Sequence, residues 1–264
     1  SRLTQPMRAG PPARPSLRPH RLTPMAAPPT AATDGVNRSP SPAVLALWRS
    51  AQAVCFDVDS TLCVDESIDE LASFLGCGDA VAALTAGAMG GATKFEDALA
   101  ARLDLMRPSR DAVDAFIAAH PPRLSPGIPE LVGKLQGKGV GVYLVSGGFR
   151  AIIDPIADML SIPRSHVHAN TILFGADGEY AGFDTKEFTS RSGGKAAAVR
   201  AIRSATGAET VIAIGDGATD VEARADGGAV AFVGYGGVVE RPAVAAAADW
   251  FVTRIADLTE ALDG

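Results

Sequence analysis

The sequence predicts an α/β fold, a doubly wound parallel sheet with a helical cap domain inserted after its first strand. Three continuous apolar runs, at 53–58, 140–146 and 210–215, are joined by segments in which apolar residues recur with helical spacing. Such runs are typical of parallel strands that helices cover on both faces. About eighty residues separate the first run from the second, far more than an ordinary crossover needs. This excess predicts the inserted domain.

The insertion itself has a helical pattern. Residues 67–71 begin with a capping-box sequence, and 94–106 and 110–120 are amphipathic. A helical domain over the ends of strands can exclude water and contact the part of a substrate that does not react. We place this cap at 64–123. The expected core comprises the two flanking parts of the chain, 43–63 and 124–264.

The second half of the chain predicts the remaining strands. Residues 171–174 and 179–183 flank Gly175–Gly178, whose Asp-Gly pair favours a tight turn, so these two segments should form a hairpin. Apolar residues at 230–233 and 249–252 predict two further strands of the main sheet.

Length and composition exclude several classes of protein. The chain has 264 residues, of which 47% are hydrophobic, enough to bury a substantial core. No apolar run approaches the ~20 residues that span a membrane. The three cysteines lack the paired spacing of a metal site, so we expect reduced thiols packed as small apolar groups.

The first residues differ from the rest in charge. Five arginines and no acid precede Asp34, so the remainder carries a formal net charge of about −11. An acid-poor segment rich in Arg, Pro, Ala, Ser and Thr is typical of organellar transit peptides, and its prolines would interrupt an amphipathic helix, which favours plastid over mitochondrion. We therefore expect residues 1–42 to be a disordered transit peptide and the protein to lie in the chloroplast. A disordered linker or a nucleic-acid-binding arm is the alternative, with mitochondrion or cytoplasm as the other locations.

Two aspartates end the first apolar run. Asp57 and Asp59 lie at the end of this run, and at a strand end both can project into one crevice. Their repulsion and desolvation are costly unless a cation neutralises them, and carboxylate oxygens suit Mg²⁺. The alternative is a capping turn, because Asp, Ser60 and Thr61 all favour helix starts.

Three later segments favour the catalytic interpretation. Ser146–Gly148 ends the second run with a hydroxyl and two glycines, which suits a phosphate-binding turn. Lys195 lies near an expected helix start, where a cation opposes the helix dipole and an anionic partner is favoured. Asp216 and Asp220 follow the third run in a Gly-Asp-Gly-x-x-Asp pattern. In this order the four segments form one signature.

The signature resembles that of the haloacid dehalogenase-like phosphohydrolases and, within them, the phosphoserine phosphatases. The likeness runs from about Leu45 to the C-terminus and implies the Rossmann-type core of that superfamily. The closer resemblance rests on seven stretches of sequence: Asp57–Thr61 with Glu66, Ala88–Gly91, Phe95 with Arg102, Ser146–Phe149, Gly178–Phe183, Ser192–Lys195 and Gly215–Asp220.

The resemblance implies Mg²⁺-dependent hydrolysis of O-phospho-L-serine to L-serine and phosphate, the last step of phosphorylated serine biosynthesis. Asp57 would be the nucleophile that forms an aspartyl-phosphate. Asp59 would be the general acid and then the general base, with a pKa raised by neighbouring carboxylates. Asp57, the Val58 carbonyl and Asp216 would hold the Mg²⁺, with Asp59 and Asp220 acting on it indirectly.

The same resemblance assigns the phosphate-binding residues. Ser146, the amides of Gly147 and Gly148, and Lys195 would hold the phosphoryl oxygens. Thr219 would line the substrate site. Asp220 would orient either Lys195 or the water around the metal.

Substrate choice is expected to depend on the cap. Arg102 falls on the apolar stripe of the helix expected at 94–106, and a guanidinium on a buried face calls for an anion. The resemblance supplies the carboxylate of phosphoserine, which Arg can bind in bidentate fashion. Glu66 would bind the α-amine; its alternative is an acid that stabilises a helix N-terminus. The pocket would also be lined by Met89, Gly90 and Phe95.

A small anionic substrate is therefore the expected partner, with neither nucleic acid nor membrane, and a homodimer is compatible with the resemblance. Another small-molecule phosphomonoesterase of the superfamily, or a phosphotransferase to an alcohol, is the alternative. A non-catalytic phospholigand-binding protein would be expected to lack Asp57, Asp59, Lys195 or Asp216, and all four are present.

Overall fold

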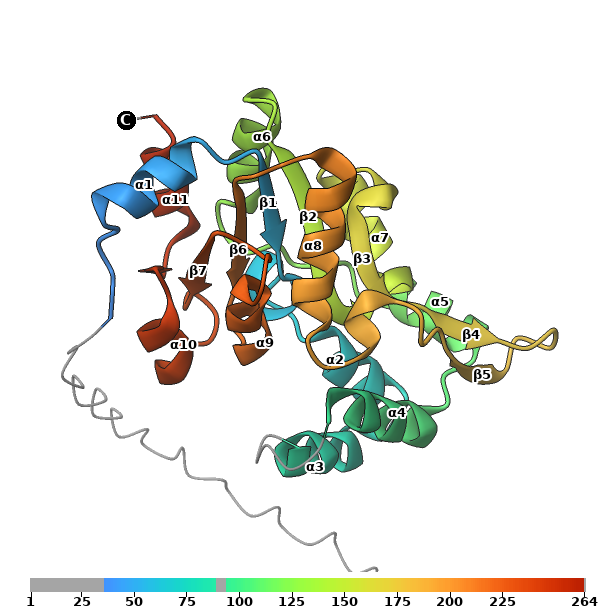
Figure 1. Ribbon diagram of the computed structural model, residues 1–264. Helices are drawn as coiled ribbons and strands as arrows, with labels where there is room; N and C mark the ends of the chain where they lie inside the picture. The colour runs from blue at the N-terminus through green and yellow to red at the C-terminus, as the bar shows by residue number, and fades with distance from the viewer. Residues whose placement is uncertain (1–35, 89–93, 264) are drawn as a thin grey trace, which may run out of the picture. The chain divides into compact units, whose positions relative to one another are not determined.

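The computed structural model describes residues 36–88 and 94–263. Its main sheet has six strands in the order β3-β2-β1-β6-β7-β8 (Figure 1), and every neighbouring pair is parallel. The chain moves from β1 outward to β3 and then returns to the other side of β1, so the doubly wound prediction is confirmed. The strands are β1 Ala53–Phe56, β2 Gly141–Phe149, β3 Val167–Asn170, β6 Val211–Gly215, β7 Ala231–Tyr235 and β8 Trp250–Val252.

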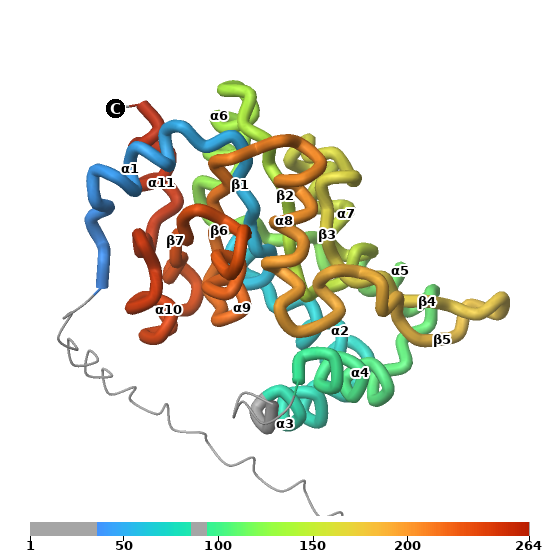
Figure 2. Tube along the Cα trace, viewed as in Figure 1, coloured from blue at the N-terminus to red at the C-terminus, as the bar shows by residue number. Residues whose placement is uncertain are grey.

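Helices cover both faces of this sheet, as the continuous apolar runs predicted (Figure 2). In β1, Val54 and Phe56 belong to one apolar core and Ala53 and Cys55 to the other. None of the helices within the described residues is long and apolar enough to cross a membrane. The first core is covered by α1 Pro42–Arg49, α6 Ile128–Gly137, α7 Arg150–Met159 and α11 Ile255–Ala261, and the second by α8 Gly194–Thr206 and α10 Pro242–Ala247.

Four helices occupy the insertion, where the sequence predicted a cap. They have an apolar core of their own, which includes Leu71, Leu99 and Phe116. The predicted hairpin is also present, because β4 Ile172–Phe174 pairs antiparallel with β5 Tyr180–Phe183, and Ile172 and Tyr180 pack into the cap core. Figure 1 shows α2 and α4 beyond the carboxyl ends of β1 and β2. The cap helices are α2 Ser67–Phe74, α3 Gly78–Ala88, α4 Phe95–Met106 and α5 Arg110–Ala119.

Short helical elements connect the larger ones and carry several site residues. They are η1 Val58–Leu62, η2 Arg164–His166, η3 Phe188–Ser190, α9 Ala218–Val221 and η4 Glu222–Arg224.

The capping box expected at 67–71 is wrong. Helix α2 begins at Ser67 and its N-cap residue, Glu66, makes no side-chain capping hydrogen bond. Instead the backbone N–H and the hydroxyl of Ser67 each donate to the carboxylate of Asp59 at 3.0 Å. The turn after β1 brings that carboxylate to the helix start, so a residue eight positions earlier replaces the local cap.

The body of the protein begins before the expected boundary at 42. The carbonyl of Asn37 accepts from the Phe251 N–H at 2.8 Å, and Arg38 pairs with Glu240 at 2.8 Å. Val36 packs against the core that α8 covers. Composition could not show this, because the contacts join a polar segment to a strand edge far away in the sequence. The transit peptide predicted for the preceding residues lies outside the described residues.

We predict that residues 36–41 stabilise the folded state. A chain lacking residues 1–41 should lose about 1–3 kcal/mol of unfolding free energy relative to a chain lacking only 1–35, because it loses the Asn37 and Arg38 contacts and the burial of Val36. Urea denaturation of the two truncated chains measures the difference. Equal stabilities would show that the segment contributes nothing to the body.

Candidate active site

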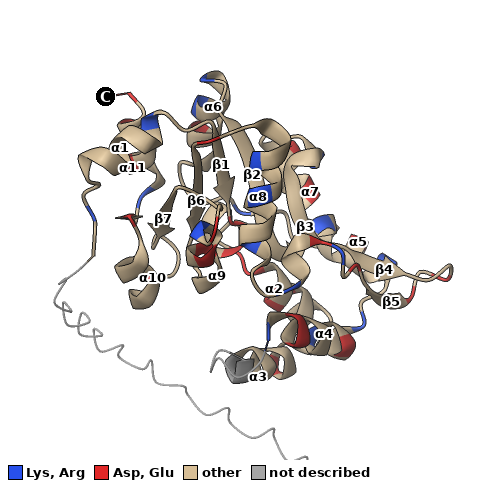
Figure 3. Cartoon of the chain, in the orientation of Figure 1, with Lys and Arg blue, Asp and Glu red and all other residues tan. Residues whose placement is uncertain are grey.

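The carboxyl ends of β1, β2 and β6 meet the first turn of α8 under the cap, the place where parallel sheets commonly bind ligands. Figure 3 shows acidic and basic positions adjoining one another between α9, the start of α8 and α2. A pocket there has walls from both the core and the cap. The expected site residues that line it are Asp57, Asp59, Glu66, Phe95, Arg102, Gly147, Lys195, Asp216 and Thr219.

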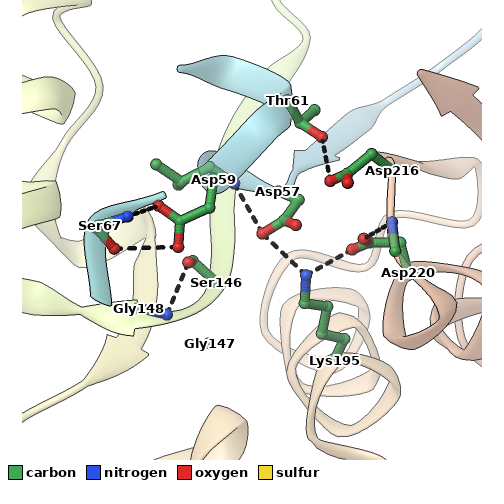
Figure 4. A network of polar contacts seen from close by, with 12 residues as sticks. Asp57, Asp59, Thr61, Ser67, Ser146, Gly147, Gly148, Lys195, Asp216 and Asp220 are labelled. Carbon is green, nitrogen blue, oxygen red and sulfur yellow. Dashed lines mark hydrogen bonds and ion pairs between the residues drawn. The ribbon is translucent and has the colours of Figure 1, made fainter. Parts of the chain in front are cut away.

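Lys195 lies between two carboxylates. Its Nζ is 2.9 Å from Oδ1 of Asp57 and 2.6 Å from Oδ1 of Asp220, and these side chains are 10%, 12% and 4% exposed (Figure 4). Burial lowers the pKa of Lys195, but Asp220 and Asp57 raise it by more, so the net change is upward. The lysine therefore stays charged beside Asp57.

Asp220 is held on two sides. Its second oxygen, Oδ2, accepts from the Gly217 N–H at 3.0 Å while Oδ1 pairs with Lys195. Burial and then Asp57 raise the pKa of Asp220, against the lowering effect of Lys195. A methyl group on Gly215 would lie 2.1 Å from Cγ of Asp220, so the last residue of β6 must be glycine for this carboxylate to fit. Asp220 thus contacts Lys195 directly, as the first of the two roles suggested by the sequence would require.

The carboxylates of this site suit a divalent cation. Asp57, Asp216 and Asp220 each offer an oxygen within 4.8 Å of the others, and hard oxygen ligands are those that Mg²⁺ prefers. Burial and then Asp57 raise the pKa of Asp216, while Arg241 and Thr61 lower it. Both oxygens of Asp220 and both oxygens of Asp216 already accept hydrogen bonds from the protein, so a cation bound here would share these carboxylates with those donors. The Val58 carbonyl accepts from the Cys63 N–H at 2.9 Å and keeps a second lone pair for a metal.

Asp59 lies on the other side of Asp57, toward the cap. Burial and then Asp57 raise the pKa of Asp59 to about 7, while its hydrogen bonds with Ser67 lower it. Gly148 packs against both Asp59 and Ser67, since a methyl group on Gly148 would lie 2.9 Å from Oγ of Ser67 and 3.2 Å from Oδ2 of Asp59. The result is an acid that can exchange a proton near neutral pH in a fixed position (Figure 4).

The turn at the end of β2 is held by a buried side chain that sequence reasoning missed. Ser146, 1% exposed, accepts from the Gly148 N–H at 2.9 Å. Asn170, fully buried at the end of β3, donates to the Gly147 carbonyl at 2.8 Å. Of the three expected turn residues, only Gly147 reaches the pocket wall. The sequence feature that could have revealed this contact was the amide residue Asn170 at the end of β3, the strand that pairs with β2.

The cap brings Arg102 and Glu66 to the same pocket. Burial lowers the pKa of Arg102, and Asp69, Asp59 and Glu66 oppose that effect. The Nε of Arg102 donates to the carbonyl of Ala98, in its own helix. Glu66 accepts from the Ser60 hydroxyl at 2.6 Å. A cation from α4 and the acid that precedes α2 therefore line the same pocket as Lys195 and Asp57.

Arg241 is a second residue that sequence reasoning missed. Its Nε donates to Oδ2 of Asp216 at 3.0 Å, and its Nη2 lies 3.9 Å from Glu66. The Thr61 hydroxyl donates to the other oxygen of Asp216 at 3.1 Å. No sequence pattern marks Arg241, which lies in a loop before α10. The expected pocket residues Met89 and Gly90 lie outside the described residues.

Comparison with known proteins assigns the family. Residues 54–224 match the model of the haloacid dehalogenase-like hydrolases. The chain is 55% identical to the chloroplastic phosphoserine phosphatase of Arabidopsis thaliana over 94% of its own length and 82% of that protein. It is 48% identical to the phosphoserine phosphatase of Bos taurus, over 82% of this chain and 96% of the other. The plastid relative agrees with the chloroplast location expected from the sequence.

Two solved structures share the fold of this chain. A phosphoserine phosphohydrolase-like protein from Francisella tularensis has a TM-score of 0.69 and 31% identity, covering 79% of this chain and 98% of that one. The structure of DsGPDH of Dunaliella salina has a TM-score of 0.77 and 40% identity, over 85% of this chain but only 38% of its own length. The chain therefore belongs to the haloacid dehalogenase-like hydrolases and, within them, to the phosphoserine phosphatase family.

Proposed function

We propose that this protein hydrolyses O-phospho-L-serine to L-serine and phosphate with Mg²⁺, through an aspartyl-phosphate at Asp57. The observation that carries the proposal is the position of Lys195, whose Nζ is 2.9 Å from Asp57 in a buried cluster that also contains Asp220. The family and the plastid relative further support a role in the chloroplast, as the last step of phosphorylated serine biosynthesis.

Asp57 is the proposed nucleophile because it combines a carboxylate, a neighbouring cation and access to the pocket. Lys195 and the Gly147 amide would bind phosphoryl oxygens and offset the charge that develops on them. Asp57, Asp216 and the Val58 carbonyl would hold Mg²⁺, which when bound supplies positive charge that neutralises the carboxylates and the phosphoryl group.

Asp59 is the proposed acid and base. With its pKa raised to about 7, the carboxyl group is protonated in a large fraction of molecules at neutral pH. It can then give its proton to the serine oxygen as the ester bond breaks, and afterwards take a proton from the water that attacks the aspartyl-phosphate. The two hydrogen bonds with Ser67 hold the carboxyl group in place for both steps.

The cap would select the amino acid. Arg102 is a partly buried cation on the pocket wall, suited to the carboxylate of the substrate, and Glu66 is an acid suited to its ammonium group. Both lie on the cap side, while Lys195 and Gly147 lie on the core side. Phosphoserine, with a phosphate at one end and a zwitterion at the other, matches this division of charge.

The roles of the two aspartates can be separated by mutation. Asp57→Asn should abolish the covalent intermediate. Asp59→Asn should lower turnover of phosphoserine by ~10²-fold or more but still allow phosphorylation by a substrate with a good leaving group, such as p-nitrophenyl phosphate. Mass spectrometry of enzyme quenched during turnover measures the phosphorylated residue. Phosphate found elsewhere than on Asp57 would contradict the assignment.

Arg102→Ala should raise the activation free energy derived from kcat/KM for phosphoserine by ~2–4 kcal/mol, because the substrate carboxylate would lose a charged partner. Phosphoethanolamine lacks that carboxylate, so its hydrolysis should change little. Arg107→Ala is the matched control, since Arg107 follows the same helix and contacts the Tyr180 ring instead of the pocket. Equal losses for both substrates would mean that Arg102 supports the cap and does not recognise the carboxylate.

A further inference from the structure

Three hydrogen bonds join the first turn of α4 to the loop before α8. One carboxylate oxygen of Glu96, Oε2, accepts from both the backbone N–H and the hydroxyl of Ser192 at 3.0 Å. The same hydroxyl accepts from the Phe95 N–H at 3.3 Å. All three bonds link the cap to the core, across 96 or 97 residues of sequence. We call this contact the Glu96–Ser192 clamp.

The clamp replaces a missing helix cap. Helix α4 follows Lys94, whose side chain makes no capping hydrogen bond, so the first backbone N–H groups of the helix need other acceptors. Ser192 supplies one of them from the opposite domain. Helix α4 therefore begins where the core holds it, and not where a local residue would cap it.

Each end of the clamp leads directly to the pocket. The ring of Phe95 lies against the phosphate-binding turn, since a methyl group on Gly147 would be 3.1 Å from its Cζ. Arg102 lies two turns further along the same helix and lines the pocket. On the core side, Ser192 precedes Lys195 by three residues. The clamp thus fixes the helix that carries Arg102 relative to the loop that leads to Lys195.

The clamp is also exposed to solvent. All its hydrogen bonds lie at the surface, where water can replace each partner. Hydrogen bonds from Ser192 lower the pKa of Glu96, so the carboxylate is ionised at neutral pH. A contact of this kind can open and close readily, which suits a cap that must admit the substrate and release serine.

We propose that Glu96 and Ser192 are positioning residues that hold α4 in place for substrate binding, so that their loss weakens affinity for phosphoserine without slowing phosphoryl transfer. The inference rests on the proposed function, because it assigns Arg102 and Phe95 to the substrate. It adds Glu96, which does not line the pocket, and Ser192, which lines the pocket and also holds the first turn of α4.

The steady-state test compares two neighbouring acids. Glu96→Ala should raise KM for phosphoserine by ~5–20-fold and change kcat by less than about twofold. Asp97→Ala is the matched control, since Asp97 lies in the same first turn of α4 and should change KM by less than about twofold. Glu96→Gln keeps a carbonyl oxygen that can accept from Ser192, so it should recover most of the affinity.

Two results would overturn the positioning role. One is a fall in kcat at unchanged KM after Glu96→Ala. The other is an equal rise in KM for the Glu96 and Asp97 variants, which would show a general effect of charge near the helix. Ser192→Ala combined with Glu96→Ala should cost no more than the larger single change, because both act through one contact; additive losses would contradict a shared clamp.

Hydrogen–deuterium exchange tests the clamp without any substrate. Glu96→Ala should speed exchange of the amides in 95–106 relative to the unmodified protein, and Asp97→Ala should not. Unchanged exchange in that segment would exclude the clamp. If the unmodified protein failed to hydrolyse phosphoserine, the proposed function would fall, while the exchange result would still decide whether Glu96 and Ser192 hold α4.

Discussion

The pairing of Lys195 with Asp57 and Asp220 is the interaction on which the rest of the site depends. Three charges are buried together at the carboxyl ends of the central strands. Each of them would cost several kcal/mol without a partner. The arrangement requires β1, β6 and α8 to end or begin within a few ångströms of one another. It also requires Gly215, because a side chain there would overlap Asp220. The parallel sheet, with its aligned carboxyl ends, supplies that geometry.

The cluster remains short of positive charge, and this shortage explains several neighbouring features. Asp216 takes hydrogen bonds from Thr61 and Arg241, one on each oxygen. The pKa of Asp59 is raised to about 7, first by burial and then by Asp57. In the proposed mechanism a metal ion would neutralise the carboxylates, and a phosphoryl group would accept hydrogen bonds from Lys195 and Gly147. The same crowding that makes the site costly to fold raises the pKa of Asp59, the proposed acid and base, toward neutral pH.

Local patterns in the sequence were sufficient to predict the sheet, the cap and most of the pocket. Continuous apolar runs end at or just before Asp57, Ser146 and Asp216, so it could be inferred that these residues lie together at the carboxyl ends of parallel strands. Contacts between segments far apart in the sequence could not be predicted from such patterns. Arg241, Asn170 and the clamp at Ser192 have partners 23 to 97 residues away, and no periodicity marks them. The capping box failed for a similar reason, because Asp59 competes for the N-terminus of α2 and is better placed.

Phosphate release from O-phospho-L-serine by metal-free protein, with and without added Mg²⁺, tests the central claim most directly. The charge shortage around Asp57 and Asp216 predicts negligible release in the presence of a chelator and saturable recovery as Mg²⁺ is added, with one free serine formed for each phosphate. Equal turnover with and without the chelator would contradict the metal-dependent account. Release of serine without matching phosphate would show instead that the phosphoryl group passes to another acceptor.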